Sequence, residues 1–443
     1  MLKLAFLLIG PRAFQSRWYV VAGLGIALIA LALLLAVNAS AGITGFTRDV
    51  LGLVFIANGA LSLAAGFLGH IRATARLATI LKATGFVLIG ALLIGLSEHA
   101  DSASAILFGL AFALDGAWRL TFALVVRYPR WRAMVLVAAV ELLLALAILA
   151  QWPIAQDRSV HLSIGLLLAL WGWLLVRLGV MLRTLESEVA LLALPLFAGR
   201  GWYDNAPVLV DPDEVEAVEH PLTVRVWTPV GSAYKAERRL LVDRYIAAID
   251  GNGVISTGHA AIEMQPDLYI SHYPDQEVDR SQSDFLARLR GTSENDFKGR
   301  FQPSYEHECG EWCPADASVE FRNYNPRRLR AFWAGYKQDD SYNLTNRNCS
   351  VLVASALDAA LEGSLASRFA WLRFAGLLVN PDMWIAAAIC QRADSMTWTP
   401  GLVLDYANTM ARIVEARETN WTVRFAGFVR HVRLSDGKAA QPS

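Results

Sequence analysis

Six apolar stretches in the first 185 residues are the feature that most constrains how this chain folds. Each is close to the ~20 residues that an α-helix needs to cross a ~30 Å hydrocarbon core. Because lipid offers backbone polar groups no hydrogen-bond partner, we expect these stretches to be helical. Short polar breaks between them disfavour a set of buried helices in a soluble protein. The stretches run approximately over Trp18–Asn38, Val50–Gly69, Leu77–Leu96, Ala103–Val126, Ala133–Gln151 and Leu162–Met181.

Charged residues make up 18% of the chain, against roughly 25% in ordinary soluble domains, and they are distributed unevenly. Residues 1–183 contain 14 Lys/Arg and 6 Asp/Glu, a net charge of +8 that the rest of the chain balances with −8. This excludes a single soluble globule, a disordered chain and a nucleic-acid binder with a basic surface. We therefore expect a membrane domain followed by a water-soluble α+β domain.

The loop charges predict the orientation of the spans. With a cytoplasmic N-terminus, nine basic residues lie on the inner side and two, Arg48 and Arg158, on the outer side. An even number of spans then places both termini and the soluble domain in the cytoplasm, below the inner (cell) membrane, with reduced cysteines. Residues 1–10 resemble the apolar core of a signal peptide but lack a cleavage site, so we expect them to be retained. The inner residues are Lys3, Arg12, Arg17, Arg72, Arg76, Arg127, Arg130, Arg132 and Arg183.

An internal repeat runs through the apolar half. Segments 52–59, 109–116 and 165–172 each begin with Gly-Leu and end in Gly, with offsets of 57 and 56 residues. The seven-residue spacing places both glycines of a segment on one helix face, where two backbones can approach closely. This pattern resembles the HdeD-like family of six-helix membrane proteins associated with acid stress, over residues 15–185. The resemblance implies three repeated helix hairpins in an all-α bundle.

Ionisable residues within the predicted spans admit two interpretations. A proton or solute path is one, because such groups are costly in lipid and usually face a bundle interior. Internal pairing and snorkelling at helix ends is the other, and we favour it because no proline interrupts any span. Asp115 and Arg119 are four residues apart and can pair. The residues are Lys82, Asp115, Arg119, Glu141 and Arg177.

Four regions follow from these patterns: residues 1–185 as the membrane domain, 186–220 as an interfacial connector, 221–365 as the α+β domain and 366–443 as an amphipathic helical tail with a disordered end. In the α+β domain we expect strands at 222–228, 244–249, 254–264 and 268–273, helices at 326–336 and from 349, and mostly loop over 281–316. Aromatic residues after Phe369 indicate either a hairpin on the inner leaflet or a helix covering the soluble domain.

Cys349 is the candidate nucleophile. Asn348-Cys349 precedes a run of apolar residues at helical spacing, and a helix N-terminus stabilises a thiolate. Such a nucleophile needs a base, which is usually histidine. His259 lies in a predicted strand after Gly258, and His272 lies in the next one, where a hairpin can bring it beside His259.

The order of these residues resembles the circularly permuted papain-like fold of the NlpC/P60 superfamily, closest to its lecithin retinol acyltransferase-like and PPPDE-type thiol enzymes. The resemblance covers residues 222–363 and implies Cys349 as nucleophile, His259 as general base, His272 as the orienting third residue and Asn348 beside the nucleophile. Glu263, on the His259 face of the same strand, is the alternative third residue. The residues after Cys349, Ser350-Val351-Leu352, depart from the acyltransferase subgroup.

Other polar residues near these motifs carry weaker indications. Tyr342 and Asn346 are candidate oxyanion donors. His307, Cys309 and Cys313 form a single cluster, whereas zinc sites combine two such clusters, so we expect no metal and no cofactor. A reduced loop or a reversible Cys309–Cys313 disulfide is the preferred interpretation.

Three functions follow. The first is a membrane-anchored cytoplasmic cysteine hydrolase that cleaves a peptide or isopeptide bond. The second uses the same thiol on a lipid acyl chain. The third is a non-enzymatic protein of membrane stress that binds a partner, with a transporter regulated by its tail as a weaker variant. The expected partners are the bilayer, a protein or lipid acyl substrate and, as a further option, a second copy of the chain, without nucleic acid.

Overall fold

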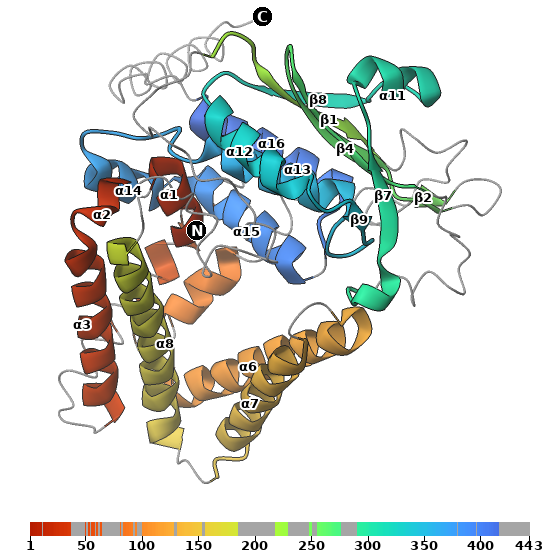
Figure 1. Cartoon of the computed structure of the whole chain (residues 1–443). Helices are drawn as coiled ribbons and strands as arrows, with labels where there is room; N and C mark the ends of the chain where they lie inside the picture. Colours follow the sequence, from red (N-terminus) through yellow and green to blue (C-terminus); the bar gives the residue numbers. More distant parts are fainter. Residues whose placement is uncertain are drawn as a thin grey trace, which may run out of the picture.

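Long apolar helices form the first half of the chain in the computed structural model (Figure 1). Among the described residues, α3 (Trp18–Ala36), α6 (Ala100–Val126), α7 (Trp131–Leu149) and α8 (Gln156–Thr184) contain four segments long and apolar enough to cross a membrane. These helices indicate a membrane protein. The predicted spans at 50–69 and 77–96 lie mostly outside the described residues. The structure describes residues 1–10, 12–36, 100–127, 131–152, 156–184, 218–228, 248–249, 255–275, 290–378, 380–395 and 397–415, with parts of 49–94.

The repeated glycines lie where helices pack most closely, as predicted from their spacing. Gly172 of α8 lies against Gly25 of α3, where a Cβ atom added at Gly172 would be 2.6 Å from the Gly25 carbonyl oxygen. Gly116 of α6 similarly lies against the backbone of α7, and Gly59 lies against the backbone of Ala83. Each repeat thus places its glycines against a neighbouring helix, and the third repeat pairs with the first span.

The N-terminal segment is a buried helix of the C-terminal region. α1 (Leu2–Ile9) buries six consecutive residues from Leu4, and the carbonyl groups of Leu7 and Leu8 accept hydrogen bonds from the backbone of Gly363 and Leu365. α2 (Arg12–Gln15) then connects α1 to α3. The signal-like hydrophobicity of this segment is therefore explained by core packing.

Two antiparallel sheets and one short strand pair form the β structure of the described part of the second half. The first has the strand order β5-β4-β1-β8, from β1 (Leu222–Trp227), β4 (His259–Met264), β5 (Leu268–Ile270) and β8 (Ala317–Phe321). The second has the order β6-β7-β9, from β6 (His272–Pro274), β7 (Phe297–Phe301) and β9 (Ser341–Tyr342). A short pair, β2 (Ala248–Ile249) and β3 (Ile255–Ser256), forms a sheet of its own.

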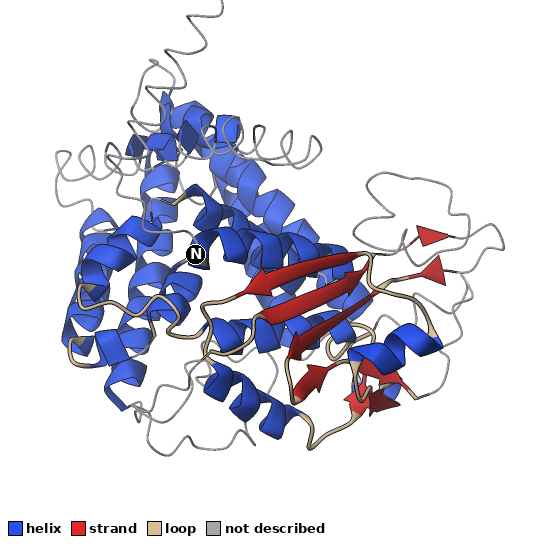
Figure 2. Cartoon of the chain, turned by 90° about the horizontal axis from the view of Figure 1, so that it is seen from above, coloured by secondary structure: helices blue, strands red, loops and turns tan. Residues whose placement is uncertain are grey.

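Helices cover one face of the first sheet (Figure 2). α13 (Cys349–Leu361) packs on β4, and α16 (Pro400–Val414) packs on β1 and β8. α12 (Pro326–Tyr336) packs beside α13, while α14 (Ala370–Leu378) and α15 (Pro381–Ser395) follow at a bend of 72°. Alternate residues of β1, Leu222, Val224 and Val226, face this core. α11 (Tyr305–Glu311) contributes Glu308 to the other face.

Two predicted strands are interrupted in the structure. The stretch 254–264 breaks at Gly258, whose φ of 68° favours glycine because it lies in the left-handed region. The stretch 268–273 breaks at Ser271, where the chain passes from the first sheet to the second. The predicted strand at 222–228, the helix at 326–336 and the helix start at Cys349 are confirmed. Most of the predicted connector, and residues 416–443, lie outside the described residues.

Candidate active site

Cys349 is the first residue of α13. The Asn348 side chain caps this helix by accepting a hydrogen bond from the Val351 N–H at 2.8 Å, and its amide donates to the Leu344 carbonyl at 2.7 Å. Cys349 is only 6% exposed. Its sulfur lies near the Ala260 N–H and within hydrogen-bonding distance of the Ser350 hydroxyl, at 3.8 Å. Helix dipole and hydrogen bonds both favour a thiolate at this position.

His259 lies beside this sulfur. It is the first residue of β4, opposite Trp227 of β1, and Gly258 turns the chain immediately before it. Its buried imidazole lies close enough to the Cys349 thiol for each group to shift the pKa of the other. The structure therefore brings together the two residues that the sequence analysis selected as nucleophile and base.

The opposite side of the His259 ring is held by a carboxylate. Its Nε2 lies 3.1 Å from Glu308 Oε1 and 2.9 Å from the Ser271 hydroxyl, and the side chains of His259 and Glu308 are 3% and 2% exposed. Tyr269 donates a hydrogen bond to the other oxygen of Glu308. Because Nε2 has these two partners, we infer that Nδ1 is the nitrogen that faces the sulfur.

Cys349, His259 and Glu308 each shift the pKa of a neighbour in this group. Burial alone lowers the pKa of His259, but the neighbouring Cys349 and Glu308 outweigh it and raise that pKa to about 9. Burial alone raises the pKa of Cys349, but the charge and hydrogen bond of His259 outweigh it, so the pKa of the thiol is lowered. Burial also acts to raise the pKa of Glu308, yet the adjacent His259 and the hydrogen bond from Tyr269 lower it. These directions favour a thiolate, an imidazolium and a carboxylate.

Aromatic rings enclose the imidazole. Tyr273 stacks on His259 with ring centroids 4.0 Å apart, and the Trp227 ring lies at 5.3 Å. Trp312 in turn stacks on Trp227 at 5.9 Å. These rings exclude water from the ion pairs, which strengthens their electrostatic interaction.

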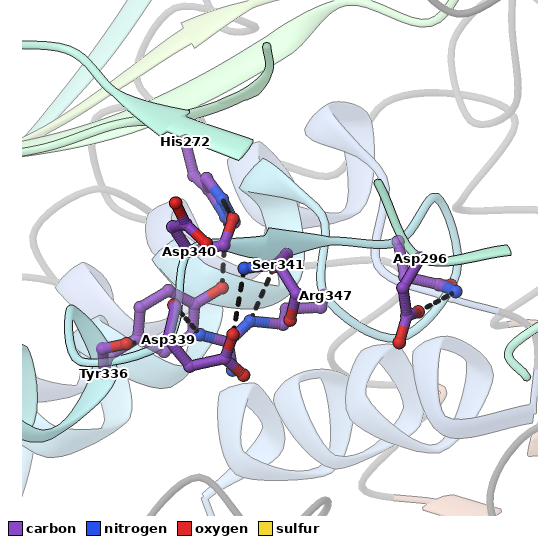
Figure 3. Close-up of polar contacts among 8 residues, drawn as sticks. His272, Asp296, Tyr336, Asp339, Asp340, Ser341 and Arg347 are labelled. Atoms are coloured by element: carbon purple, nitrogen blue, oxygen red, sulfur yellow. Dashed lines mark hydrogen bonds and ion pairs between the residues drawn. The ribbon is translucent and has the colours of Figure 1, made fainter. Parts of the chain in front are cut away.

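His272 occupies a separate polar network (Figure 3). Its Nε2 lies 3.2 Å from the Asp340 carbonyl oxygen, to which it donates, and its Nδ1 lies 3.2 Å from the Tyr336 hydroxyl. Burial, opposed by the Asp340 bond and assisted by Arg347, lowers the pKa of His272 to about 4. Neither ring nitrogen contacts His259 through a described hydrogen bond. The strand break at Ser271 accounts for this, since it moves His272 to the second sheet and leaves Ser271 at His259.

Glu263, the alternative third residue, has a different partner. It lies on the same face of β4 as His259, but its carboxylate pairs with Arg225 at 2.6 Å. The candidate oxyanion donors are also engaged: Asn346 donates to the Gly291 carbonyl at 2.8 Å, and the Tyr342 ring packs edge-on against His272. Glu308 thus takes the place that the sequence analysis gave to His272 or Glu263.

Glu308 and Ser271 are the site residues that the sequence analysis did not select. Glu308 belongs to a helix of only seven residues in a segment expected to be mostly loop. The helical spacing of Tyr305, Glu308 and Trp312 carries a signal, because it places the carboxylate among aromatic side chains that pack on Trp227. Ser271 carries no such signal, since its role depends on the strand break.

Two other groups of polar residues stand out in the sequence. Cys309 and Cys313 are free thiols, His307 pairs with Glu311 at 3.4 Å, and no metal-binding group of three or more side chains occurs among the described residues. In the apolar half, Arg119 pairs with Asp115 at 2.8 Å and with Glu141 at 3.2 Å. These contacts agree with internal pairing of the intramembrane charges.

Comparisons with protein families, curated proteins and solved structures find no match to this chain.

Proposed function

We propose that this chain is a membrane-anchored cysteine hydrolase with Cys349 as nucleophile, His259 as general acid and base, and Glu308 as the residue that orients His259. The observation that carries the proposal is the buried group formed by a thiol at a helix N-terminus, an imidazole beside it and a carboxylate 3.1 Å from that imidazole. A nucleophile, a base and a group that orients the base are the three parts that nucleophilic acyl transfer requires.

The reaction follows from the ionised resting state. The Cys349 thiolate attacks a carbonyl carbon, and the new C–S bond places a negative charge on the carbonyl oxygen. The His259 imidazolium gives its proton to the leaving nitrogen as the C–N bond breaks. In the second half of the reaction, neutral His259 takes a proton from a water molecule. The oxygen of that water bonds to the acyl carbon at the same time. The C–S bond then breaks, and the thiolate–imidazolium pair is restored with release of a carboxylic acid.

The N-terminus of α13 supports the charged intermediate in this proposal. N–H groups in the first turn of a helix have no acceptor within the helix, and the helix dipole adds a partial positive charge. In α13, the N–H of Val351, the third residue, donates its hydrogen bond to the Asn348 side chain. The N–H groups of Cys349 and Ser350 are the donors we assign to the oxyanion.

The position of the thiol favours a peptide, isopeptide or other amide over a lipid acyl chain. α13 contains 13 residues, which corresponds to about 18 Å along its axis. Its C-terminal end is followed by Gly363, which bonds to α1, whereas Cys349 lies at the opposite end. The length of α13 therefore separates the thiol from α1, the apolar helix that precedes the first span.

The architecture we propose combines two resemblances: an HdeD-like six-helix bundle, and a permuted papain-like domain of the NlpC/P60 superfamily. The helix-capping Asn348, the strand histidine His259 and the antiparallel sheet under α13 support the second. The basic residues of the inner loops support a multi-pass protein of the cell membrane whose site and termini face the cytoplasm.

An active-site titration tests this proposal on the full chain in detergent. We expect p-nitrophenyl acetate to release up to one equivalent of p-nitrophenolate in a rapid burst, with one acetyl group on Cys349 by peptide mass spectrometry. Cys349→Ala should abolish the burst. Cys390→Ser is the matched control, because Cys390 lies on α15 and should leave the burst unchanged.

Two results would contradict the proposal. One is an unchanged burst in Cys349→Ala. The other is an intact fold, by circular dichroism and size-exclusion chromatography, with no acetylation of Cys349 at any pH between about 5 and 9. The second result favours the non-enzymatic partner-binding function.

A further inference from the structure

An exposed apolar and basic surface lies at one end of the α3–α8 helix pair. Phe369, the residue before α14, and Leu372, in the first turn of α14, are 69% and 74% exposed. Exposed side chains of this size are uncommon next to each other on a face that meets only water. The opposite face of α14 is buried through Ala370 and Leu377.

Contacts with α2 fix the level of α14 relative to the spans. The buried ring of Phe14 lies 5.1 Å from Trp371 and 5.6 Å from Phe374. Phe14 precedes Trp18, the first residue of α3, by four residues, or about one helical turn. Figure 1 shows α14 beside α1, just beyond the ends of α3 and α8 where α2 connects. α14 therefore lies about one turn from the point where α3 begins.

The same level carries the residue types of a membrane interface. Arg183, in the last turn of α8, lies over the Trp18 ring at 5.0 Å. Tryptophan and arginine are typical of the boundary between hydrocarbon and headgroups. Arg17 and Arg368 are exposed near this boundary as well. The apolar core also continues here, because Phe14, Val21, Leu178 and Leu182 belong to the same buried cluster as α13 and α14.

We propose that the exposed face of α14, with Phe369 and Leu372, is inserted into the headgroup region of the bilayer that α3 and α8 cross. In this proposal Arg17, Arg183 and Arg368 bind the headgroups of anionic lipids. The continuity with the spans and the positive charge identify this occupant. The amphipathic geometry is that of an interfacial helix, with apolar side chains toward the acyl boundary and cations toward phosphate. This proposal is independent of the reaction proposed above.

Fluorescence quenching at a single label tests the inference on the full chain in lipid vesicles. The four native cysteines are replaced, and bimane is attached at Leu372→Cys. Two matched positions serve as references: Leu143→Cys on α7, 65% exposed inside a candidate span, and Lys337→Cys, exposed at the end of α12. The vesicles contain phosphatidylcholine with 30% phosphatidylglycerol, and the quenchers are lipid carrying a doxyl group near the headgroup, and aqueous iodide.

We expect position 372 to be quenched by doxyl lipid at least as strongly as position 143, and several-fold less by iodide than position 337. Arg368→Gln in the same background should reduce doxyl quenching at position 372. This effect of Arg368→Gln should be smaller in vesicles that lack the anionic lipid. Iodide quenching equal to that at 337 would overturn the proposal. Shielding from both quenchers would also overturn it, since that result means a protein surface, such as a second copy, covers α14.

Discussion

Replacing Glu308 by Gln removes the negative charge behind His259 without removing the side chain. Glutamine keeps an oxygen for the Tyr269 hydroxyl and the volume of the original residue. It loses the ion pair with His259 Nε2, which is 3.1 Å long and almost fully buried. The imidazolium is then less stable, and so is the thiolate that pairs with it. We expect the pKa of Cys349 to rise and the pKa of His259 to fall in Glu308→Gln.

The size of the change follows from the geometry. At 3.1 Å and an effective dielectric constant of about 20, the Coulomb attraction is about 5 kcal/mol. Desolvation of both groups offsets much of this, and hydrogen bonds to charged groups contribute a net of about 1.5–3 kcal/mol. One pH unit corresponds to about 1.4 kcal/mol. The midpoint of Cys349 ionisation should therefore move upward by about one to two pH units.

The assay is the second-order rate of Cys349 alkylation by iodoacetamide as a function of pH, read by mass spectrometry of the Cys349 peptide. Glu263→Gln is the matched control, because Glu263 is a carboxylate on the same face of β4 that pairs with Arg225 instead. An unchanged midpoint in folded Glu308→Gln, or an equal change in Glu263→Gln, would refute the reasoning.

Three further predictions follow from other parts of the structure. His272 has a folded pKa of about 4, below the unfolded 6.5, so its contribution to stability is present above pH 6.5 and is lost as pH falls toward 4. Between pH 6.5 and 4, the free energy of unfolding of His272→Gln should therefore fall by about 3 kcal/mol less than that of wild type, measured by urea unfolding. Gly172→Val should destabilise the α3–α8 pair by about 1–3 kcal/mol through overpacking, while Gly23→Val, whose Cβ meets nothing within 4 Å, should not, measured by thermal unfolding in detergent. Asn348→Ala should lower the free energy of unfolding by about 0.5–2 kcal/mol and slow Cys349 alkylation at pH 6. Asn325→Ala, which uncaps α12, should lower the free energy of unfolding by a similar amount without slowing alkylation.

Local patterns made several elements predictable from the sequence. Residues 326–336 combine Pro near the helix start with Leu329, Phe332, Trp333 and Tyr336 at helical spacing, and all of these signals act within one element. Asn348 marks a helix start because its side-chain oxygen accepts a hydrogen bond from an N–H just three residues further along the chain. The close approach of the repeated glycines was predictable for the same reason, since a seven-residue spacing defines one helix face.

Long-range features were not predictable in this way. The third residue at His259 depends on where the strand after Leu268 breaks. Ser271 and His272 are adjacent in sequence, yet the break leaves one at His259 and the other beside Tyr336 and Asp340. Glu308 reaches His259 across 49 residues of chain, so the local helical spacing can group it with Tyr305 and Trp312 but cannot show that it contacts His259. Likewise, residues 1–10 are apolar whether they enter a membrane or a protein core, and only the contacts with Gly363 and Leu365 distinguish the two.

The thiolate–imidazolium pair of Cys349 and His259 is the central claim, and the pH dependence of Cys349 alkylation in wild type and His259→Ala tests it most directly. An unperturbed cysteine titrates near ~8.5. The account predicts rapid labelling of wild-type Cys349 at about pH 6, and loss of that labelling in His259→Ala. Slow labelling in both proteins that rises only above about pH 8 would contradict it and identify Cys349 as a structural cysteine.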